Sequence, residues 1–248
     1  MTYFVVSDIH SFFDEFKKAI DEAGFDPTNE NHRLIICGDL FDRGSQPLEL
    51  IRYLNLETPN AILIRGNHED LFVKMCERGE PLMNDYSNRT AQTVYGLVES
   101  NEPWTFQERA NVALGKVTPI LERMVDYYET EHYIFVHGWI PCISERQGKY
   151  SPIMNYAYWS GWRDATAKEW ENARWYNGMD CADQGVIEPN KIIVCGHWHC
   201  SYGHWLAGES DYPDGVGADY TPYYGNGIIA IDACTAYSGK VNCIVIND

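Results

Sequence analysis

Long apolar runs are missing from this sequence of 248 residues, and basic residues are scarce. No stretch approaches the roughly 18 apolar residues of a membrane-spanning helix, so we expect no membrane association. No basic region or apolar signal core precedes the first expected strand, which favours a cytoplasmic location. The net charge is −17, with 19 basic and 36 acidic residues. Because nucleic-acid binding usually needs a basic surface, we expect none here.

Clustered cysteines are absent as well, since none of the eight cysteines belongs to a Cys-x-x-Cys pair. This spacing argues against a structural zinc site. Unbridged thiols fit a reducing compartment better than an extracellular one. The hydrophobic content of 45% is ordinary for a globular protein. We therefore expect a single domain over residues 1–248 with a substantial core.

The first seventy residues alternate between short apolar runs, typical of buried strands, and segments with apolar residues at helical spacing. This strand–helix–strand–helix–strand order calls for parallel strands covered by helices, which is an α/β arrangement. The expected strands are 3–6, 34–37 and 61–64, and the expected helices are 12–23, 47–54 and 69–77.

The rest of the chain is less regular. Residues 81–130 are expected to be polar helices that form one wall of a site. An aromatic-rich segment, about 139–190, predicts a cap of loops over the strand ends, with a short helix near 164–176. Its aromatic side chains are expected mainly to pack inside the cap, and the alternative is that one of them stacks on the substrate. Glycine, proline and tyrosine residues between 202 and 226 indicate an irregular loop. Further strands are expected at 133–136, 191–195, 227–232 and 240–246, the last two joined by a turn at 238–239.

Five of the expected strands run into polar motifs. Open α/β sheets bind their ligands at the carboxyl ends of strands, so the side chains of these motifs are expected to meet. Repeated carboxylate, imidazole and amide groups suit two divalent metal ions and a phosphate ester. The motifs are Ser7-Asp8-Ile9-His10, Gly38-Asp39-Leu40-Phe41-Asp42-Arg43-Gly44, Gly66-Asn67-His68-Glu69, His137-Gly138 and Gly196-His197-Trp198-His199.

These motifs supply a complete set of candidate metal ligands. Asp8 and His10 can reach one cation, and Asp39 can offer one oxygen to each of two cations. Mixed oxygen and nitrogen ligands suit manganese first, with iron or zinc also tolerated, better than they suit calcium. The remaining candidates are the amide oxygen of Asn67 and the imidazoles of His137, His197 and His199.

The same motifs supply groups for phosphoester hydrolysis. Two divalent cations held by two carboxylates leave a site of roughly +2, which attracts a phosphate dianion. The cations also lower the pKa of a water between them, so that hydroxide can attack phosphorus. His68, kept protonated by Asp42, can serve as the general acid for the leaving group. Arg43 can bind the phosphate oxygens, and Arg163 is a second candidate from the cap.

The motifs Gly38-Asp39-x-x-Asp42-Arg43-Gly44 and Arg65-Gly66-Asn67-His68-Glu69 closely resemble those of calcineurin-like metallophosphoesterases, and within them the phosphoprotein phosphatases of bacteria and their phages. The resemblance extends from Tyr3 to about Ile246. It implies a four-layer fold of two mixed β-sheets, packed as a sandwich and flanked by helices. It also implies two metal-ion sites: Asp8, His10 and Asp39 hold one ion, and Asp39, Asn67, His137 and His197 hold the other. By the same resemblance, His68 and Asp42 form the proton-donating pair, and Arg43 and Arg163 bind the phosphate.

The sequence departs from this family pattern in three places. Ser7 and Ser11 stand where the family usually has glycines. His199 is a second histidine that phosphoprotein phosphatases commonly lack, although the wider superfamily often uses it as a metal ligand. The segment Gly196-His197-Trp198 also resembles the symmetrical diadenosine tetraphosphate hydrolases.

Three functions follow as hypotheses. The first is a phosphatase for phosphoserine or phosphothreonine in proteins, favoured by Asp42-Arg43-Gly44 and by the motif at 66–69. The alternative is a symmetrical dinucleoside polyphosphate hydrolase, favoured by Trp198 and the aromatic cap. A non-catalytic scaffold is the third, but such proteins usually lose a ligand or the proton donor, and every expected position is filled here. The expected partner is thus a phosphoprotein or a small phosphoester.

Overall fold

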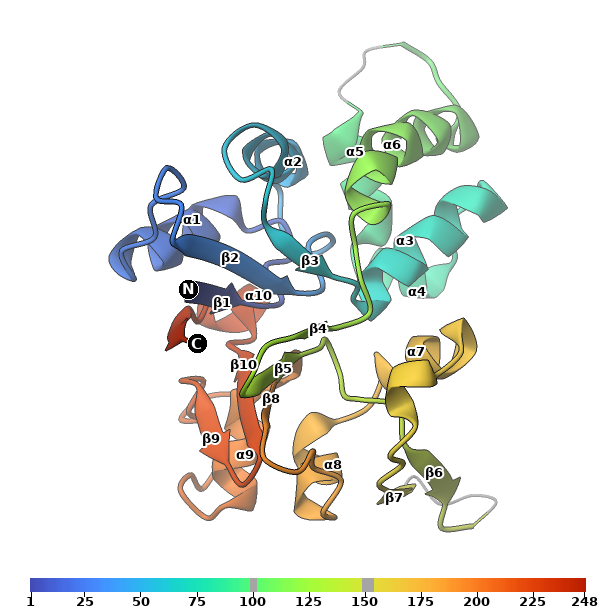
Figure 1. Ribbon diagram of the computed structural model, residues 1–248. Coiled ribbons are helices and arrows are strands. Elements are labelled where there is room, and N and C mark those ends of the chain that lie inside the picture. Colours follow the sequence, from blue (N-terminus) through green and yellow to red (C-terminus); the bar gives the residue numbers. More distant parts are fainter. Residues whose placement is uncertain (99–101, 149–153) are drawn as a thin grey trace.

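A computed structural model describes residues 1–98, 102–148 and 154–248 of the chain. Figure 1 shows two large β-sheets near the centre of the molecule, with helices packed around them. The described residues also include a small two-stranded sheet.

The first sheet consists, in spatial order, of β11 (Ile244–Asn247), β1 (Thr2–Val6), β2 (His32–Cys37) and β3 (Ile62–Ile64). β1, β2 and β3 are parallel, and β11 joins β1 in antiparallel direction at one edge. Parallel neighbours need crossover connections, which α1 (Phe13–Glu22) and α2 (Pro47–Leu56) provide. The predicted alternation of strands and helices in this part of the chain is confirmed.

The second sheet consists, in spatial order, of β4 (Tyr128–Glu129), β5 (Tyr133–Phe135), β8 (Ile192–His199), β10 (Ile228–Asp232) and β9 (Tyr223–Gly225). Its three central strands are parallel and its two edge strands antiparallel. The last two predicted strands are not neighbours, because β10 lies in the second sheet and β11 in the first. The helix α10 (Thr235–Ser238) ends at the predicted turn, Ser238-Gly239, in the segment that crosses between the sheets.

The two sheets pack face to face. Strand residues point alternately to the two faces of a sheet, so every second residue faces the partner sheet. Val5 and Ile35 from the first sheet meet Phe135, Val194 and Ile231 from the second in one buried cluster. This arrangement is the β-sandwich that the family resemblance implied.

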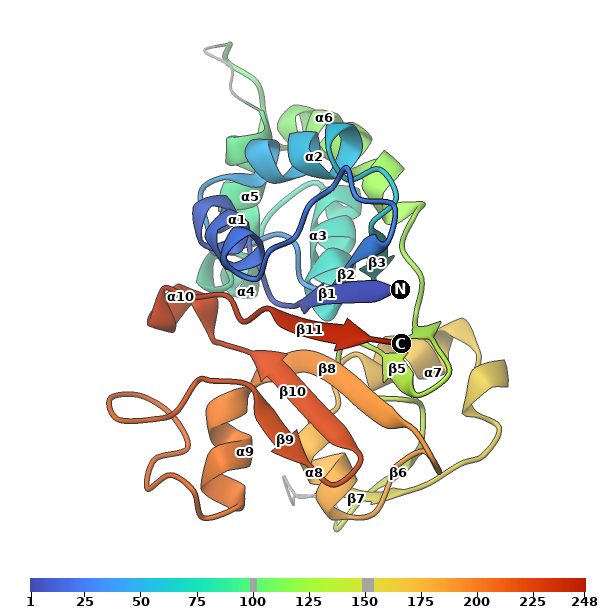
Figure 2. The same ribbon diagram turned by 60° about the vertical axis from the view of Figure 1, so that its left-hand side comes forward.

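Helices cover the outer face of each sheet, which gives four layers (Figure 2). The predicted fold class, two mixed sheets packed as a sandwich between helices, is therefore confirmed. The helices on the first sheet are α1, α2, α3 (Asn67–Arg78), α5 (Thr90–Leu97) and α6 (Phe106–Leu121), with the short α4 (Met83–Ser87) before α5; those on the second are α7 (Ala167–Ala173), α8 (Gly178–Asp183) and α9 (Cys200–Leu206).

The middle of the chain and the aromatic segment follow the predictions in part. Residues 81–130 are mainly helical as predicted, although 99–101 lie outside the described residues. The aromatic segment packs on the outer face of the second sheet, and its residues 149–153 are not among those described. Trp139, Trp162 and Trp170 are buried there, as predicted, whereas Trp175 is half exposed.

Several elements were absent from the predictions. The aromatic segment contains a hairpin of β6 (Ile143–Arg146) and β7 (Met154–Ala157), the 3-10 turn η1 (Trp162–Asp164) and α8, besides the predicted short helix at α7. The region predicted to be an irregular loop contains most of α9 and all of β9. These elements are short, and glycine or tyrosine residues in β7, α8, α9 and β9 mask the periodicity on which the predictions depend.

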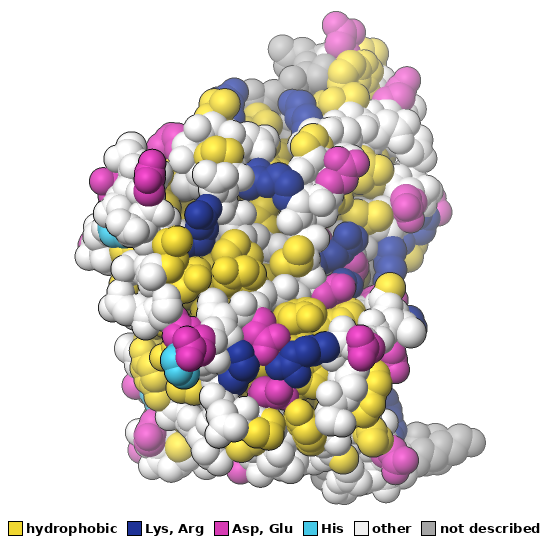
Figure 3. All heavy atoms as spheres, viewed as in Figure 1, with side chains coloured by type: hydrophobic (Ala, Val, Ile, Leu, Met, Phe, Trp, Pro, Cys, Tyr) yellow, Lys and Arg dark blue, Asp and Glu magenta, His cyan; other side chains and the backbone are white. Residues whose placement is uncertain are grey.

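The surface carries charged side chains of both signs. On the face shown in Figure 3, lysine and arginine side chains lie among acidic ones. Among the described residues, no helix has both the length and the apolar character needed to cross a membrane.

Candidate metal centre

The predicted ligand motifs meet where strands of both sheets end. Asp8 and His10 follow β1, and Asp39 follows β2. His137 follows β5, and His197 lies near the end of β8. Because β1 and β2 are parallel, as are β5 and β8, their carboxyl ends bring these side chains together from both halves of the sandwich.

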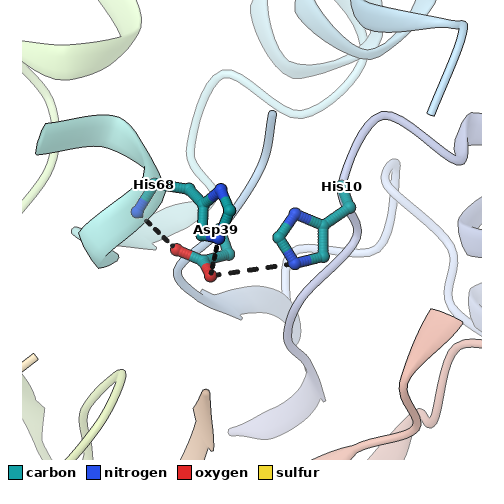
Figure 4. A group of neighbouring side chains, drawn as sticks. All are labelled: His10, Asp39 and His68. Atoms are coloured by element: carbon teal, nitrogen blue, oxygen red, sulfur yellow. Dashed lines mark hydrogen bonds and ion pairs between the residues drawn. The ribbon is translucent and has the colours of Figure 1, made fainter. Parts of the chain in front are cut away.

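One compact group consists of His10, Asp39 and His68, whose ligand atoms lie within 4.8 Å of one another. Figure 4 shows the carboxylate of Asp39 between the two imidazoles. Its Oδ2 is 3.8 Å from Nε2 of His10 and 3.9 Å from Nε2 of His68. Asp8 lies beside this group, with Oδ1 4.0 Å from Nε2 of His10.

A second compact group consists of Asp39, His137 and His197. Nε2 of His137 is 3.3 Å from Oδ1 of Asp39 and 2.8 Å from Oδ1 of Asn67. Asp39 thus belongs to both groups, with one oxygen facing each. A shared carboxylate between two ligand sets is the arrangement expected for a pair of divalent ions.

The protonation of two histidines supports a cation in each group. Nδ1 of His10 donates to the carbonyl oxygen of Phe41, and Nδ1 of His137 donates to that of Cys37, both at 2.8 Å. In a neutral imidazole the lone pair is then on Nε2, which faces carboxylate oxygen. Two facing lone pairs repel unless a cation lies between them, so the donor set fits divalent metal ions.

Burial keeps two of the candidate ligand imidazoles, those of His10 and His197, neutral, as metal ligation requires. It lowers the pKa of His10 well below its ordinary value and that of His197 to about 3. Asp39 is also buried, but the neighbouring histidines outweigh the burial and lower the pKa of its carboxyl. The metal-binding forms of all three side chains are therefore favoured.

The ligands lie on strained backbone. Asp8, His10, Asp39 and His197 have φ values of 49°, 49°, 53° and 67°. Such left-handed conformations are costly for residues with a Cβ atom and gather at functional sites. They turn successive side chains of a short loop toward the same point.

Two glycines allow the loops to approach. A Cβ atom on Gly66 would lie 2.1 Å from Oδ1 of Asp39, and one on Gly196 would lie 2.2 Å from Oδ2 of Asp8. Any larger residue would displace a carboxylate of the site, which explains the glycine before Asn67 and the one before His197.

Glu69 holds two of the loops together, a role that the sequence analysis missed. Its buried carboxylate accepts hydrogen bonds from the backbone N–H groups of Asp39, Leu40 and Gly66. Burial, followed by the charge of Asp39, raises its pKa to about 7. Its place in the first turn of a helix, where a carboxylate can cap N–H groups, was the available signal.

The two residues of the candidate acid pair, His68 and Asp42, lie in contact. Nδ1 of His68 is 2.7 Å from Oδ2 of Asp42. Burial opposes a charge on His68, but Asp39 and the hydrogen bond to Asp42 raise its pKa to about 9. Nη2 of Arg43 lies 3.4 Å from Nε2 of His68, so both side chains face the same space.

Helix α5 holds Asp42 in place. The hydroxyls of Thr90 and Thr93 donate to Oδ2 and Oδ1 of Asp42 at 2.7 and 3.0 Å. The expectation that the middle segment forms a wall of the site agrees with these contacts, although neither threonine was singled out. A threonine pair three residues apart on one helix face was the only local signal.

Arg163 does not lie with this cluster. Its guanidinium donates to Glu129 and to Glu188, and it stacks over the ring of Trp162. Glu129 also forms an ion pair with Lys191, which lies just before the start of β8. The candidate ligand His197 lies near the other end of that strand. Six strand residues span about 20 Å, so the two carboxylates hold Arg163 far from the metal ligands.

His199 and Asp232 lie beside the centre. His199 belongs to neither compact group, and its ring lies 6.1 Å from that of Tyr220. Asp232, at the end of β10, is buried and pairs in register with His199. The sequence analysis did not select Asp232, although it ends a buried strand in the same way as the selected carboxylates.

Curated relatives match part of this chain. It is 34% identical over 79 residues to the symmetrical bis(5′-nucleosyl)-tetraphosphatase of Aromatoleum aromaticum. The matched residues make up 32% of this chain and 28% of the relative. It is 37% identical over 90 residues to the enzyme of the same name from Actinobacillus succinogenes. Here the matched residues make up 36% of this chain and 31% of the relative. The matched stretch is thus less than a third of each relative.

Solved structures match over nearly the whole chain at low identity. A cold-active protein-tyrosine phosphatase of Shewanella superposes with a TM-score of 0.53 and 16% identity, covering 100% of this chain and 75% of that chain. A candidate diadenosine tetraphosphatase superposes with a TM-score of 0.51 and 14% identity, covering 99% and 89%. These likenesses concern the fold alone.

The family comparison covers most of the chain. The model of the calcineurin-like phosphoesterases matches residues 1–201. The matched residues include every position of the two compact groups, Asp8, Asn67 and the His68–Asp42 pair. The chain therefore belongs to the calcineurin-like phosphoesterase family, whose members are metal-dependent hydrolases of phosphoesters.

Proposed function

We propose that this phosphoester hydrolase uses two divalent metal ions to cleave dinucleoside polyphosphates. The observation that carries the proposal is the carboxylate of Asp39, shared between two ligand groups that lie beside the His68–Asp42 pair. The partial similarity to symmetrical bis(5′-nucleosyl)-tetraphosphatases supports this substrate class over phosphoproteins. Manganese is the first proposed metal and the cytoplasm the proposed location, where free thiols such as those of this chain persist.

The proposed ligand sets follow the geometry. His68 is left out of them, because its Nδ1 contacts a carboxylate and its pKa is raised, both of which favour the protonated form. Asp8 and Asn67 are included because each contacts a histidine of one group. Arg163 is left out because Glu129 and Glu188 bind its guanidinium, and His199 because it belongs to neither group and its ring lies against Tyr220. The first set is Asp8, His10 and Asp39, and the second is Asp39, Asn67, His137 and His197.

When bound, the two cations supply positive charge for the phosphate oxygens and lower the pKa of an attacking water. The residues of the chain supply the rest. Arg43 donates to a phosphate oxygen from its position beside His68. His68 holds a proton on Nε2, toward the leaving oxygen, while Asp42 accepts from Nδ1 and keeps the ring oriented. Thr90 and Thr93 hold Asp42 in turn.

A phosphatase for phosphoserine or phosphothreonine is the second candidate. The motifs Asp42-Arg43-Gly44 and Asn67-His68-Glu69 favour it, since they match those of phosphoprotein phosphatases. Arg43 is partly exposed and could accept the single phosphate of a monoester. The same two motifs serve both candidates, so the substrate must be decided by experiment.

The test compares initial rates on metal-stripped protein reloaded with manganese. Diadenosine tetraphosphate and a phosphothreonine peptide are supplied at equal concentration, and the products are separated by chromatography. We expect faster cleavage of the dinucleotide, with adenosine diphosphate as the sole nucleotide product. Faster release of phosphate from the peptide would instead establish the second candidate, and the absence of turnover on both would refute both.

A further inference from the structure

A cavity of about 520 Å³ adjoins the proposed metal centre. We call it the tryptophan pocket; it is lined by Trp175, Trp198, Tyr202, the pair Pro213 and Asp214, and the histidines His197 and His199. His197 is also a member of the second ligand group, so the pocket begins at the metal centre. Its volume is in the range of small-molecule sites, about 300–1,000 Å³. A substrate whose phosphate lies at the metals can therefore extend into it.

The two tryptophans of this pocket are exposed to solvent but each packs against a neighbouring ring. Trp175, from the aromatic segment, is 50% exposed, and Trp198, in β8, is 42% exposed. Trp159 is partly buried, and the other tryptophans of the aromatic segment are buried. Trp175 packs edge-on to His197 with ring centroids 5.8 Å apart. Trp198 packs similarly on Tyr202, at 5.7 Å. These contacts fix the two indoles while leaving ring surface free to stack with a flat ligand.

A carboxylate stands among the aromatic side chains. Oδ1 of Asp214 accepts hydrogen bonds from the N–H of Gly215 and from the hydroxyl of Tyr220, at 2.7 and 2.8 Å. The loop is anchored by Ser201, whose hydroxyl donates to the carbonyl of Pro213. Within the described residues, these hydrogen bonds involve Oδ1 alone, so Oδ2 of Asp214 can accept a hydrogen bond from a ligand N–H. The carboxylate repels a second anionic group and favours a flat ligand that carries donors.

We propose that the tryptophan pocket binds a purine base of the substrate. The base stacks on Trp175 or Trp198, and its amino group donates to Asp214. This inference rests on the proposed function, because a dinucleoside polyphosphate places a base a short phosphate chain away from the cleaved bond. The aryl ring of a phosphotyrosine would fill the apolar part of the pocket but would leave Asp214 without a donor.

The first test uses binding, which needs no turnover. Titration of metal-free protein with adenosine monophosphate is followed by tryptophan fluorescence or calorimetry. Loss of one stacking contact is expected to weaken binding roughly 5- to 150-fold in Trp175→Ala or Trp198→Ala, and Trp175→Phe should restore part of it. Trp104→Ala is the control, since Trp104 is 39% exposed but does not line the pocket.

The contact to Asp214 has its own test. Purine riboside monophosphate lacks the amino group that is proposed to donate a hydrogen bond to the carboxylate of Asp214. Wild-type protein should bind adenosine monophosphate several-fold more tightly than this analogue, and Asp214→Ala should abolish the difference. Equal binding of both nucleotides to the wild type would overturn the assigned orientation of the base.

Steady-state rates separate this inference from the proposed function. In Trp198→Ala, kcat/KM for diadenosine tetraphosphate should fall, while kcat/KM for a small alkyl phosphate, which has no ring to stack in the pocket, should stay within about twofold. If both rates fall together, or if neither does, the base site is refuted although dinucleotide cleavage stands. If the wild type binds the nucleotide through Trp175 but does not cleave the dinucleotide, the base site stands and the proposed substrate is refuted. Loss confined to an aryl phosphate assayed in parallel would assign the pocket to an aryl ring and overturn the inference.

Discussion

At the scale of single residues, Gly66 determines whether Asp39 can serve both ligand groups. In Gly66→Ala, the new Cβ would lie 2.1 Å from Oδ1 of Asp39, so that carboxylate must move. We expect manganese to be lost from the purified protein and the free energy of unfolding to fall by about 1–3 kcal/mol. Gly115→Ala is the control, because its Cβ meets nothing within 4 Å in the middle of α6 and a helical alanine is favoured by up to about 1 kcal/mol. Equal metal content in the two variants would contradict this role.

The charge of His68 also acts at the residue scale, and it makes the stability of the metal-free protein depend on pH. The folded chain raises the pKa of His68 to about 9 from its ordinary value of 6.5. The protonated histidine therefore stabilises the fold fully below pH 6.5, and this contribution is lost as the pH rises toward 9. We expect the free energy of unfolding to fall between pH 6.5 and 8 by up to about 1.4 kcal/mol per pH unit, as measured by urea denaturation. His68→Asn should remove this slope, and an unchanged slope in that variant would assign it to other groups.

At the scale of elements, α5 connects the polar middle of the chain to the proposed chemistry. The variant Thr90→Val with Thr93→Val keeps the side-chain shape but removes both hydroxyls from Asp42. We expect kcat to fall about 10- to 100-fold with unchanged manganese content, because the acid pair is loosened while the ligands stay in place. Thr118→Val is the control, since its hydroxyl donates only to Leu114 within α6. A loss of metal together with activity would show that α5 supports the ligands instead.

At the scale of the whole molecule, a buried ionic network joins the helices of the two halves. Arg174, at the end of α7, donates to Asp70 of α3 and to Asp126, and Asp70 also pairs with Arg65. Arg174→Met should lower the free energy of unfolding by about 3 kcal/mol, because a buried carboxylate loses one of its partners. Arg52→Met, on the exposed side of α2, should change it by less than about 0.5 kcal/mol. Similar urea midpoints for the two variants would show that the network contributes little.

The sequence by itself determined the features that depend on neighbouring residues. Apolar runs followed by Asp8, Asp39 and His137 predicted both the strands and the edge at which their ligands meet. Strand and helix periodicity are local properties, so the alternation of the first seventy residues was readable without a structure. The choice of ligand types followed from side-chain chemistry alone.

Tertiary structure decided the features that depend on contacts between distant segments. It placed β10 and β11 in different sheets, although the sequence indicated only that a serine–glycine turn joins the two strands. It placed the hydroxyl of Thr90 in hydrogen-bond contact with Asp42. It also bound Arg163 to Glu129 and Glu188, away from the expected phosphate position. It also divided the tryptophans, burying Trp162 and leaving Trp175 beside a ligand pocket. These outcomes depend on sheet order and on which charged groups pack together, and neither is contained in the local pattern of a sequence.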